Sequence, residues 1–315
     1  MITLYRLQEK KIVGIQATCG DSLPCDALWI DLLNPTPEEK SLVSKAYNQL
    51  LPSAEDVQEI EASSRFFIDE QGLHIRSYFL FQFPERFENV TMAFILNQGR
   101  LFTIRHEKLE SIHIFKQRLA TGAIQIKDNF DLLFSLFEIK VDRLADRLEL
   151  LQSEIDNISQ DVYDGDNRNL EHIVLRLGSL QDTNDKIRLG MLDMQRLFSF
   201  FKRSGYNLRQ NLKILHSLIE DIDSLVQYST FLFDKSDSLL NVTIGLISSE
   251  QNKIIRIFSI ISVVFMPPTL VASLYGMNFD LMPELHWPHG YLFALALMLV
   301  SAIVPYLLFR LKGWL

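Results

Sequence analysis

The sequence of 315 residues contains only two cysteines, Cys19 and Cys25, and its N-terminus lacks the apolar core of a signal peptide. We therefore expect nothing to be cleaved and the N-terminal part to stay in the cytoplasm. In that reducing compartment the two cysteines are predicted to be free thiols.

Basic residues are also in deficit. Up to residue 252 the chain has 27 Lys and Arg against 37 Asp and Glu, a net charge of −10. Binding to duplex nucleic acid needs clustered basic residues, so a nucleic-acid partner is excluded. An acidic surface suits contact with cations, although it is also common solubility chemistry.

Catalytic motifs are missing from the first 125 residues. They contain no glycine-rich phosphate loop, no nucleophile elbow and no Cys/His zinc spacing. Their histidines, His74, His106 and His113, have no suitably spaced cysteine, serine or metal-ligating partner. We therefore predict that the protein is not an enzyme.

Two long stretches near the C-terminus lack charge altogether. Residues 257–274 and 291–309 contain no Asp, Glu, Lys or Arg. A bilayer core of about 30 Å is crossed by about 20 such residues in a helix. The two stretches predict transmembrane helices at 254–275 and 291–309, which excludes a purely soluble enzyme and a secreted domain.

The basic residues around these spans indicate their orientation. Lys253 and Arg256 precede the first span, Arg310 and Lys312 follow the second, and the loop 276–290 has no Lys or Arg. The positive-inside rule then puts both termini in the cytoplasm and the loop in the periplasm, with 310–315 as a basic cytoplasmic tail. We expect a multi-pass protein of the inner (plasma) membrane, in contact with the lipid bilayer.

The cytoplasmic part shows two kinds of pattern. Residues 1–125 mix strand and helix signals: strands at 27–33 and 74–83, a helix at 36–49 that opens with Pro37, and a hairpin of 90–96 with 100–104. Residues 126–206 then carry apolar residues at 3–4 spacing, broken at 165–167, which predicts an antiparallel hairpin of long helices. The fold class is an α+β cytoplasmic domain with a long helical stalk.

A third helix is predicted from near Leu208, with its cytoplasmic part at 207–253 and no Gly-Pro break before Pro267. One face of it is polar or small from Asn241 to Ser273. A polar stripe in a membrane helix faces protein or water. Two interpretations stay open: tight helix packing through small residues, or a pore lined by one helix from each of several subunits. The predicted pore-lining residues are Asn252, Ile255, Ser259, Ser262, Met266 and Thr269.

The first span ends in Gly276-Met277-Asn278. Gly276 is predicted to take the left-handed conformation that ends many helices. Asn278 would place a neutral amide oxygen at the outer mouth, where a ring of such oxygens suits Mg²⁺ that keeps its water shell. Asp280 and Glu284 would attract cations from outside.

These residues resemble the CorA magnesium and cobalt transport family. The similarity rests on residues 266–285 (MPPTLVASLYGMNFDLMPEL), the basic tail, and the stretches 29–39 and 60–79, and it resembles the enterobacterial branch. It implies a funnel-shaped homopentameric channel for Mg²⁺ influx, with Co²⁺ and Ni²⁺ as further substrates. It also implies that Gly276, Met277 and Asn278 form the selectivity filter. The family's polar pore positions fall on Asn252 and Thr269, and its apolar constrictions fall on Ile255 and Met266.

The resemblance further implies gating by cytoplasmic Mg²⁺ bound to acidic residues between subunits. No strict motif identifies these residues, and the candidates are Asp56, Glu59, Glu61, Glu220, Asp221 and Asp223. The main rival function is a zinc or other divalent cation transporter on the same scaffold, against which Met277 argues. An enzyme anchored by the two spans and a structural membrane scaffold are also rivals.

Overall fold

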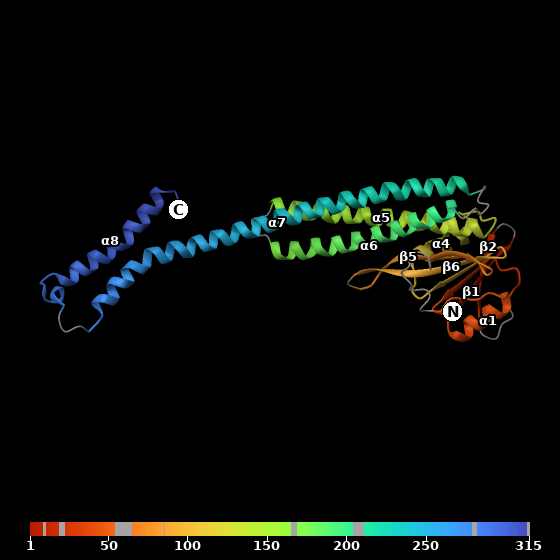
Figure 1. The fold of residues 1–315 in the computed structure, drawn as a ribbon, viewed down its shortest axis with the longest axis horizontal. Coiled ribbons are helices and arrows are strands. Elements are labelled where there is room, and N and C mark those ends of the chain that lie inside the picture. Colours follow the sequence, from red (N-terminus) through yellow and green to blue (C-terminus); the bar gives the residue numbers. More distant parts are fainter. Residues whose placement is uncertain are drawn as a thin grey trace. The chain divides into compact units, whose positions relative to one another are not determined.

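The computed structural model describes residues 1–8, 11–18, 23–53, 65–84, 86–164, 169–203, 211–278 and 282–313. The chain divides into two compact units, Met1–Leu240 and Asn241–Leu315. We call them unit 1 and unit 2 (Figure 1). Unit 1 holds a β-sheet with long helices beside it, and unit 2 holds the two apolar helices.

Unit 1 is built on one seven-stranded sheet in the order β2-β1-β3-β7-β6-β5-β4. Its strands β3 and β7 are parallel, and the other neighbouring pairs are antiparallel. The strands are β1 (Ile2–Gln8), β2 (Lys11–Ala17), β3 (Trp29–Leu33), β4 (Phe66–Asp69), β5 (Gly72–Gln82), β6 (Phe87–Asn97) and β7 (Arg100–Arg105).

Two local predictions in unit 1 are confirmed. The hairpin between β6 and β7 turns at Gln98 and Gly99, whose φ angles of 47° and 74° are those of a tight two-residue turn. Helix α1 (Pro37–Tyr47) begins with a capping box, in which Thr36 accepts a hydrogen bond from the Glu39 amide and the Glu39 side chain accepts one from the Thr36 amide. Both features come from residues close together in the sequence.

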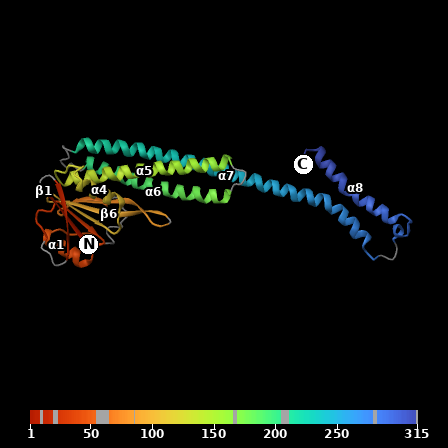
Figure 2. The ribbon, with the colours of Figure 1, turned by 180° about the vertical axis from the view of Figure 1, so that it is seen from behind.

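Helices cover both faces of the sheet. On one face, Val43 and Tyr47 of α1 pack on a buried cluster that includes Ile30, Ile95 and Phe102. On the other face lie α4 (Glu110–Ala120), α5 (Asn129–Asp164) and α6 (Leu170–Arg203). Aromatic rings dominate this second layer: Trp29, Phe79, Phe94, Phe115, Phe137 and Phe198 are all buried. The result is a helix–sheet–helix sandwich, and Figure 2 shows α5 and α6 from behind.

Helix α7 (Leu212–Tyr275) is continuous over 64 residues. The predicted continuity of the third helix is therefore confirmed, and Pro267 and Pro268 lie inside the helix without ending it. Its first part packs in unit 1, where Ser229 of α7 and Asn184 of α6 form two reciprocal hydrogen bonds of 3.0 Å. After the short helix η1 (Pro283–His286), α8 (Gly290–Leu311) follows in unit 2.

The sandwich of unit 1 buries two charged networks. In the first, Asp31 of β3 accepts hydrogen bonds from Thr103, Arg105 and Lys116 at 2.7–3.2 Å. Burial by itself would raise the pKa of Asp31, but the bonds and charge of Arg105 and Lys116 hold it below its ordinary value. This network fastens α4 to the centre of the sheet.

The second network joins β5, α5 and α6. Asp193 of α6 pairs with Arg65 at 3.0 Å and accepts a hydrogen bond from the Ser77 hydroxyl at 2.8 Å. Lys140 of α5 donates to the same hydroxyl at 2.9 Å, and its ammonium lies 4.5 Å from the centre of the Phe79 ring. Only 3% of Lys140 is exposed, and burial lowers its pKa to about 7.

We expect Lys140→Met to stabilise the protein. The pKa of Lys140 is about 7 in the folded chain and 10.5 ordinarily. Between pH 7 and 10.5 the amine is therefore protonated in the unfolded chain and largely neutral in the folded chain. The free energy of unfolding consequently rises with pH over that window. Methionine removes the cost of burying the amine of Lys140 but loses its hydrogen bond to Ser77. The free energy of unfolding should therefore rise by about 1–3 kcal/mol near pH 7.

The measurement is the Tm of the full-length protein between pH 7 and 10. Lys140→Met should raise Tm most at pH 7 and flatten its rise with pH, whereas Lys127→Met, at an exposed position, should follow the original protein. An unchanged pH slope in Lys140→Met would contradict the lowered pKa.

Candidate ion pathway along helix α7

The predicted polar stripe lies on an exposed face of α7 in unit 2. The most apolar part of this helix is 0% buried inside the chain. Ile255 is 61% exposed and Met266 is 69% exposed, values typical of surface residues in a single chain. All six predicted pore-lining residues are exposed: Asn252, Ile255, Ser259, Ser262, Met266 and Thr269. The stripe is therefore available to face another subunit, lipid or water.

The three hydroxyl groups of the stripe bond to their own helix. Ser259 donates to the Ile255 carbonyl at 2.8 Å, Ser262 to the Phe258 carbonyl at 2.9 Å, and Thr269 to the Phe265 carbonyl at 2.7 Å. A hydroxyl has one donor and two acceptor lone pairs, so these bonds use the donors and leave acceptors facing outward. Outward-facing acceptors suit the water shell of a cation.

A different face of α7 is partly covered within unit 2. Its half-buried positions include Ile260, Val264 and Val271, at spacings typical of one helix face. On α8 the buried or half-buried positions Ala294, Met298, Ser301, Pro305 and Phe309 follow the same spacing. At 3.6 residues per turn the half-buried face of α7 lies roughly 160° around the axis from the stripe. The stripe and the half-buried positions therefore lie on different faces of α7.

The end of α7 differs from the prediction in one respect. Gly276 does not take the left-handed conformation, so that prediction was wrong. Instead its amide donates to the Ala272 carbonyl at 2.9 Å, and a Cβ atom there would lie 3.1 Å from the same oxygen. Glycine is favoured here because the helix end closes tightly on its own last turn. Met277 and Asn278 follow directly, and both are exposed.

Of the two acidic residues predicted to attract cations, the structure describes Glu284, and Asp280 lies outside the described residues. Glu284 is half-buried in η1, and its carbonyl accepts a hydrogen bond from the Trp287 amide at 3.3 Å. The Trp287 ring lies 5.9 Å from the Phe293 ring of α8, which fastens this segment to the second span. Glu284 is therefore held close to the start of α8.

The predicted regulatory residues do not form one group in a single chain. Asp56, Glu59 and Glu61 lie outside the described residues. On α7, Glu220 pairs with His216 at 3.3 Å, whereas Asp223 accepts a hydrogen bond from Gln195 of α6 at 2.6 Å. Within the described part of the chain, no three acidic, histidine or cysteine side chains come together to hold a metal ion.

The third member, Asp221, faces acidic residues that the sequence did not single out. The pKa of Glu138 on α5 is raised by partial desolvation, then by the charges of Asp142 and Asp221. Glu138 and Asp142 are one helical turn apart, so an acidic spacing of four on α5 was visible in the sequence. The sequence does not show that these residues of α5 lie close to Asp221 of α7, because nearly 80 residues separate Asp142 from Asp221.

Comparison with known proteins agrees with this arrangement. Residues 26–311 match the family described as CorA-like Mg²⁺ transporter protein. The chain is 38% identical to the magnesium transport protein CorA of Salmonella typhimurium and 37% identical to that of Haemophilus ducreyi, with 100% of both chains covered in each case.

A solved structure of similar fold is the CorA magnesium transporter of Methanocaldococcus jannaschii. The TM-score is 0.77 over 100% of this chain and 99% of that one, at 19% sequence identity. The full-length matches and the shared fold agree with the resemblance seen in residues 266–285. The chain belongs to the CorA family of Mg²⁺ transporter proteins.

Proposed function

We propose that this protein forms a homopentameric channel that conducts Mg²⁺ into the cytoplasm across the inner membrane, with both termini on the cytoplasmic side. Co²⁺ and Ni²⁺ are its further substrates. The selectivity filter is Gly276, Met277 and Asn278, and the pore is lined by the stripe from Asn252 to Thr269. The observation that carries the proposal is the exposed stripe, which leads along α7 directly to the exposed amide of Asn278.

An oligomer is required by the number of spans. Among the described residues of one chain, only α7 and α8 qualify as membrane helices, and two helices are too few to enclose a pore. The exposed stripe is free to face the same stripe of other copies around an axis. The outward hydroxyl acceptors of Ser259, Ser262 and Thr269 would then line a hydrated path, and Asn252 would lie at its cytoplasmic end.

The experiment is divalent cation flux into liposomes that contain only this chain. Mg²⁺ uptake should follow the inward gradient, and Co²⁺ should compete with it. Uptake of Zn²⁺ with no uptake of Mg²⁺ would favour a zinc transporter, and a lack of flux through a correctly assembled oligomer would contradict the proposal.

Cysteine labelling tests which face of α7 lines the pore. Cysteines at Ser259, Ser262 and Thr269 should react with a water-soluble thiol reagent at least about tenfold faster than cysteines at Ile257 and Ile260, because only the stripe meets water. The measurement is the labelling rate in membranes, in a background without Cys19 and Cys25. Equal rates at both sets would contradict the assignment.

We further propose that cytoplasmic Mg²⁺ closes the channel by binding acidic residues between neighbouring subunits. Each chain carries −10 up to residue 252, so closely packed copies repel one another and bound cations relieve that repulsion. Mg²⁺ can favour the closed ring only if it binds that state more tightly than the open one. Glu220, Asp221 and Asp223 are exposed on α7, and the divergent directions of their side chains suit contact with a second subunit better than chelation within one chain.

Neutralising this cluster should weaken inhibition by Mg²⁺. In Glu220→Gln, Asp221→Asn and Asp223→Asn combined, we expect the internal Mg²⁺ concentration for half-maximal closure to rise at least about fivefold, since the cation loses its ligands. The measurement is flux against internal Mg²⁺. Glu171→Gln, an exposed acidic position at the start of α6, is the matched control. Unchanged inhibition in the triple variant would assign sensing to other residues.

A further inference from the structure

Helix α7 meets α6 in unit 1 through a pair of buried polar residues. The buried positions of α7 there recur every three or four residues and include Leu215, Leu218, Ile222, Ser229, Leu232, Ser236 and Leu239. On α6, Asn184 lies in a similar run of buried residues, between Leu180 and Ile187. Asn184 is 3% exposed and Ser229 is 0% exposed. An amide and a hydroxyl are thus enclosed at positions where the spacing alone favours aliphatic side chains.

The two residues satisfy each other in both directions. The side-chain amide of Asn184 donates to the Ser229 backbone carbonyl, and the Ser229 hydroxyl donates to Oδ1 of Asn184, both at 3.0 Å. A slip of α7 by one turn, about 5.4 Å, would bring Leu225 or Leu232 to Asn184 in place of Ser229. Neither leucine side chain can donate a hydrogen bond, and a buried acceptor left without one is costly. The pair therefore penalises slips that the apolar spacing would tolerate.

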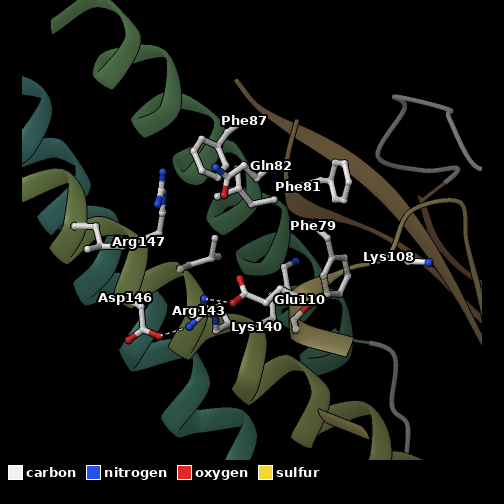
Figure 3. A pocket seen from close by; sticks show the side chains of 14 residues that line it. Phe79, Phe81, Gln82, Phe87, Lys108, Glu110, Lys140, Arg143, Asp146 and Arg147 are labelled. Carbon is white, nitrogen blue, oxygen red and sulfur yellow. Dashed lines mark hydrogen bonds and ion pairs between the residues drawn. The ribbon is translucent and has the colours of Figure 1, made fainter. Parts of the chain in front are cut away.

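The ion pairs between helices of unit 1 select a position less strictly. Arg143 of α5 pairs with Glu110 of α4 at 2.6 Å and with Asp146 at 3.0 Å, as Figure 3 shows. All three side chains are at least 37% exposed. Long exposed side chains can follow a helix that moves, and water can replace a lost partner. The short, buried side chains of Asn184 and Ser229 can do neither.

A second buried serine on α7 lacks such a partner. Ser236 lies seven residues after Ser229 and is 1% exposed, and its hydroxyl finds no hydrogen-bond partner among the described residues. A slip of two turns could bring Ser236 to Asn184, but it would also separate Asp223 from Gln195, whose side chains lie 2.6 Å apart. The helix thus carries the same side chain at two equivalent positions, once with a partner on α6 and once without.

We propose that Asn184 is a positioning residue that holds α7 at one axial position on α6. A buried polar pair stabilises a helix interface less than aliphatic residues would, and its best-known role is to fix the register of two helices. Because α7 continues to Tyr275 as one helix, its axial position also fixes that of the polar stripe. The consequence for the pore rests on the proposed channel function, whereas the positioning of α7 on α6 does not.

The test is disulfide formation within one chain, in full-length protein whose own cysteines are replaced. A cysteine at Gln195 is combined either with one at Asp223, its partner in the structure, or with one at Gln227, one turn further along α7. In Asn184→Leu the rate of the second disulfide relative to the first should rise at least about fivefold, because two hydrogen bonds that oppose the slip are lost. Ser236→Ala should change this ratio less than about twofold, because its hydroxyl has no partner to lose.

Stability separates positioning from simple packing. Asn184→Leu should keep or raise the Tm, since aliphatic residues replace buried polar groups without loss. Ser229→Ala removes one of the two hydrogen bonds and should raise the disulfide ratio about threefold, so it decides alone if Asn184→Leu fails to fold. A folded Asn184→Leu and a folded Ser229→Ala that both keep the original ratio would overturn the proposal, because the pair would then only fill space.

Flux shows whether the position of α7 matters to the pore. In Asn184→Leu, Mg²⁺ uptake at inhibitory internal Mg²⁺ should rise at least about threefold, because shifted helices would close an apolar ring imperfectly. Ser236→Ala should close like the original protein. A raised disulfide ratio with unchanged closure would overturn the role of Asn184 for the pore. If the original protein conducts no Mg²⁺ at all, the channel function fails, and the disulfide ratios still decide the positioning.

Discussion

Replacing Asn278 by either aspartate or alanine is expected to reduce Mg²⁺ flux at least about tenfold while the oligomer still assembles. The amide of Asn278 offers one acceptor and two donors without net charge, so a ring of such amides can hold the water shell of Mg²⁺ loosely. A ring of carboxylates would bind the ion too tightly for rapid release, and a ring of methyl groups would offer the water shell no partner. The measurement is Mg²⁺ uptake into liposomes beside the elution volume of the oligomer.

The competing interpretation is that Asn278 only caps the end of α7. The structure argues against it, because the backbone amides of Gly276 and Met277 already bond to the carbonyls of Ala272 and Leu274. His286→Ala, at an exposed position of the same segment between α7 and α8, is the control and should keep its flux. Flux and ion preference unchanged in Asn278→Ala would contradict the filter assignment.

Much of the helical architecture could be predicted, because its signals are local. The apolar spacing that predicted long helices on either side of 165–167 gives α5 and α6, and the absence of a break before Pro267 gives the continuous α7. The β6–β7 turn was equally local, since two adjacent residues with positive φ set it. In each case the residues that decide the structure lie within a few positions of one another.

Strands β1 and β2 were not predicted, because the residues of one strand are explained only by side chains of the other. Gly14 interrupts β2 and looks unfavourable for a strand, yet it faces Tyr5 of β1, and a Cβ atom there would come within 2.7 Å of the Tyr5 ring. The ring of Tyr5 in turn stacks on Trp29 with centres 4.3 Å apart. The glycine is therefore explained by a neighbouring strand and a third strand beyond it.

The same contrast runs through the candidate sites. The stripe on α7 could be predicted because heptad spacing alone determines which residues share a helix face. The cluster Glu220, Asp221 and Asp223 looked compact in the sequence, but adjacent helical residues point about 100° apart, so its members meet different neighbours.

Opening the apolar constriction at Ile255 is expected to have the second large effect. Ile255 and Met266 interrupt the polar stripe, and both are exposed in the single chain, so in a closed ring they would face the axis. A narrow ring of apolar side chains expels water and blocks hydrated ions without a plug. Ile255→Ser replaces the isoleucine side chain of each subunit by a hydroxyl group, which should keep water in the constriction.

We therefore expect Ile255→Ser to raise Mg²⁺ leak at inhibitory internal Mg²⁺ by about fivefold or more, with little change in flux at low internal Mg²⁺, where the channel is already open. Ile255→Leu should stay closed, because it keeps the ring apolar and of similar volume. Ile257→Ser makes the same change on the far side of the helix and should also stay closed. The measurement is Mg²⁺ uptake into liposomes preloaded with Mg²⁺. If Ile255→Ser closes as tightly as Ile257→Ser, the narrowest point of the pore lies elsewhere, and Met266 becomes the next residue to test.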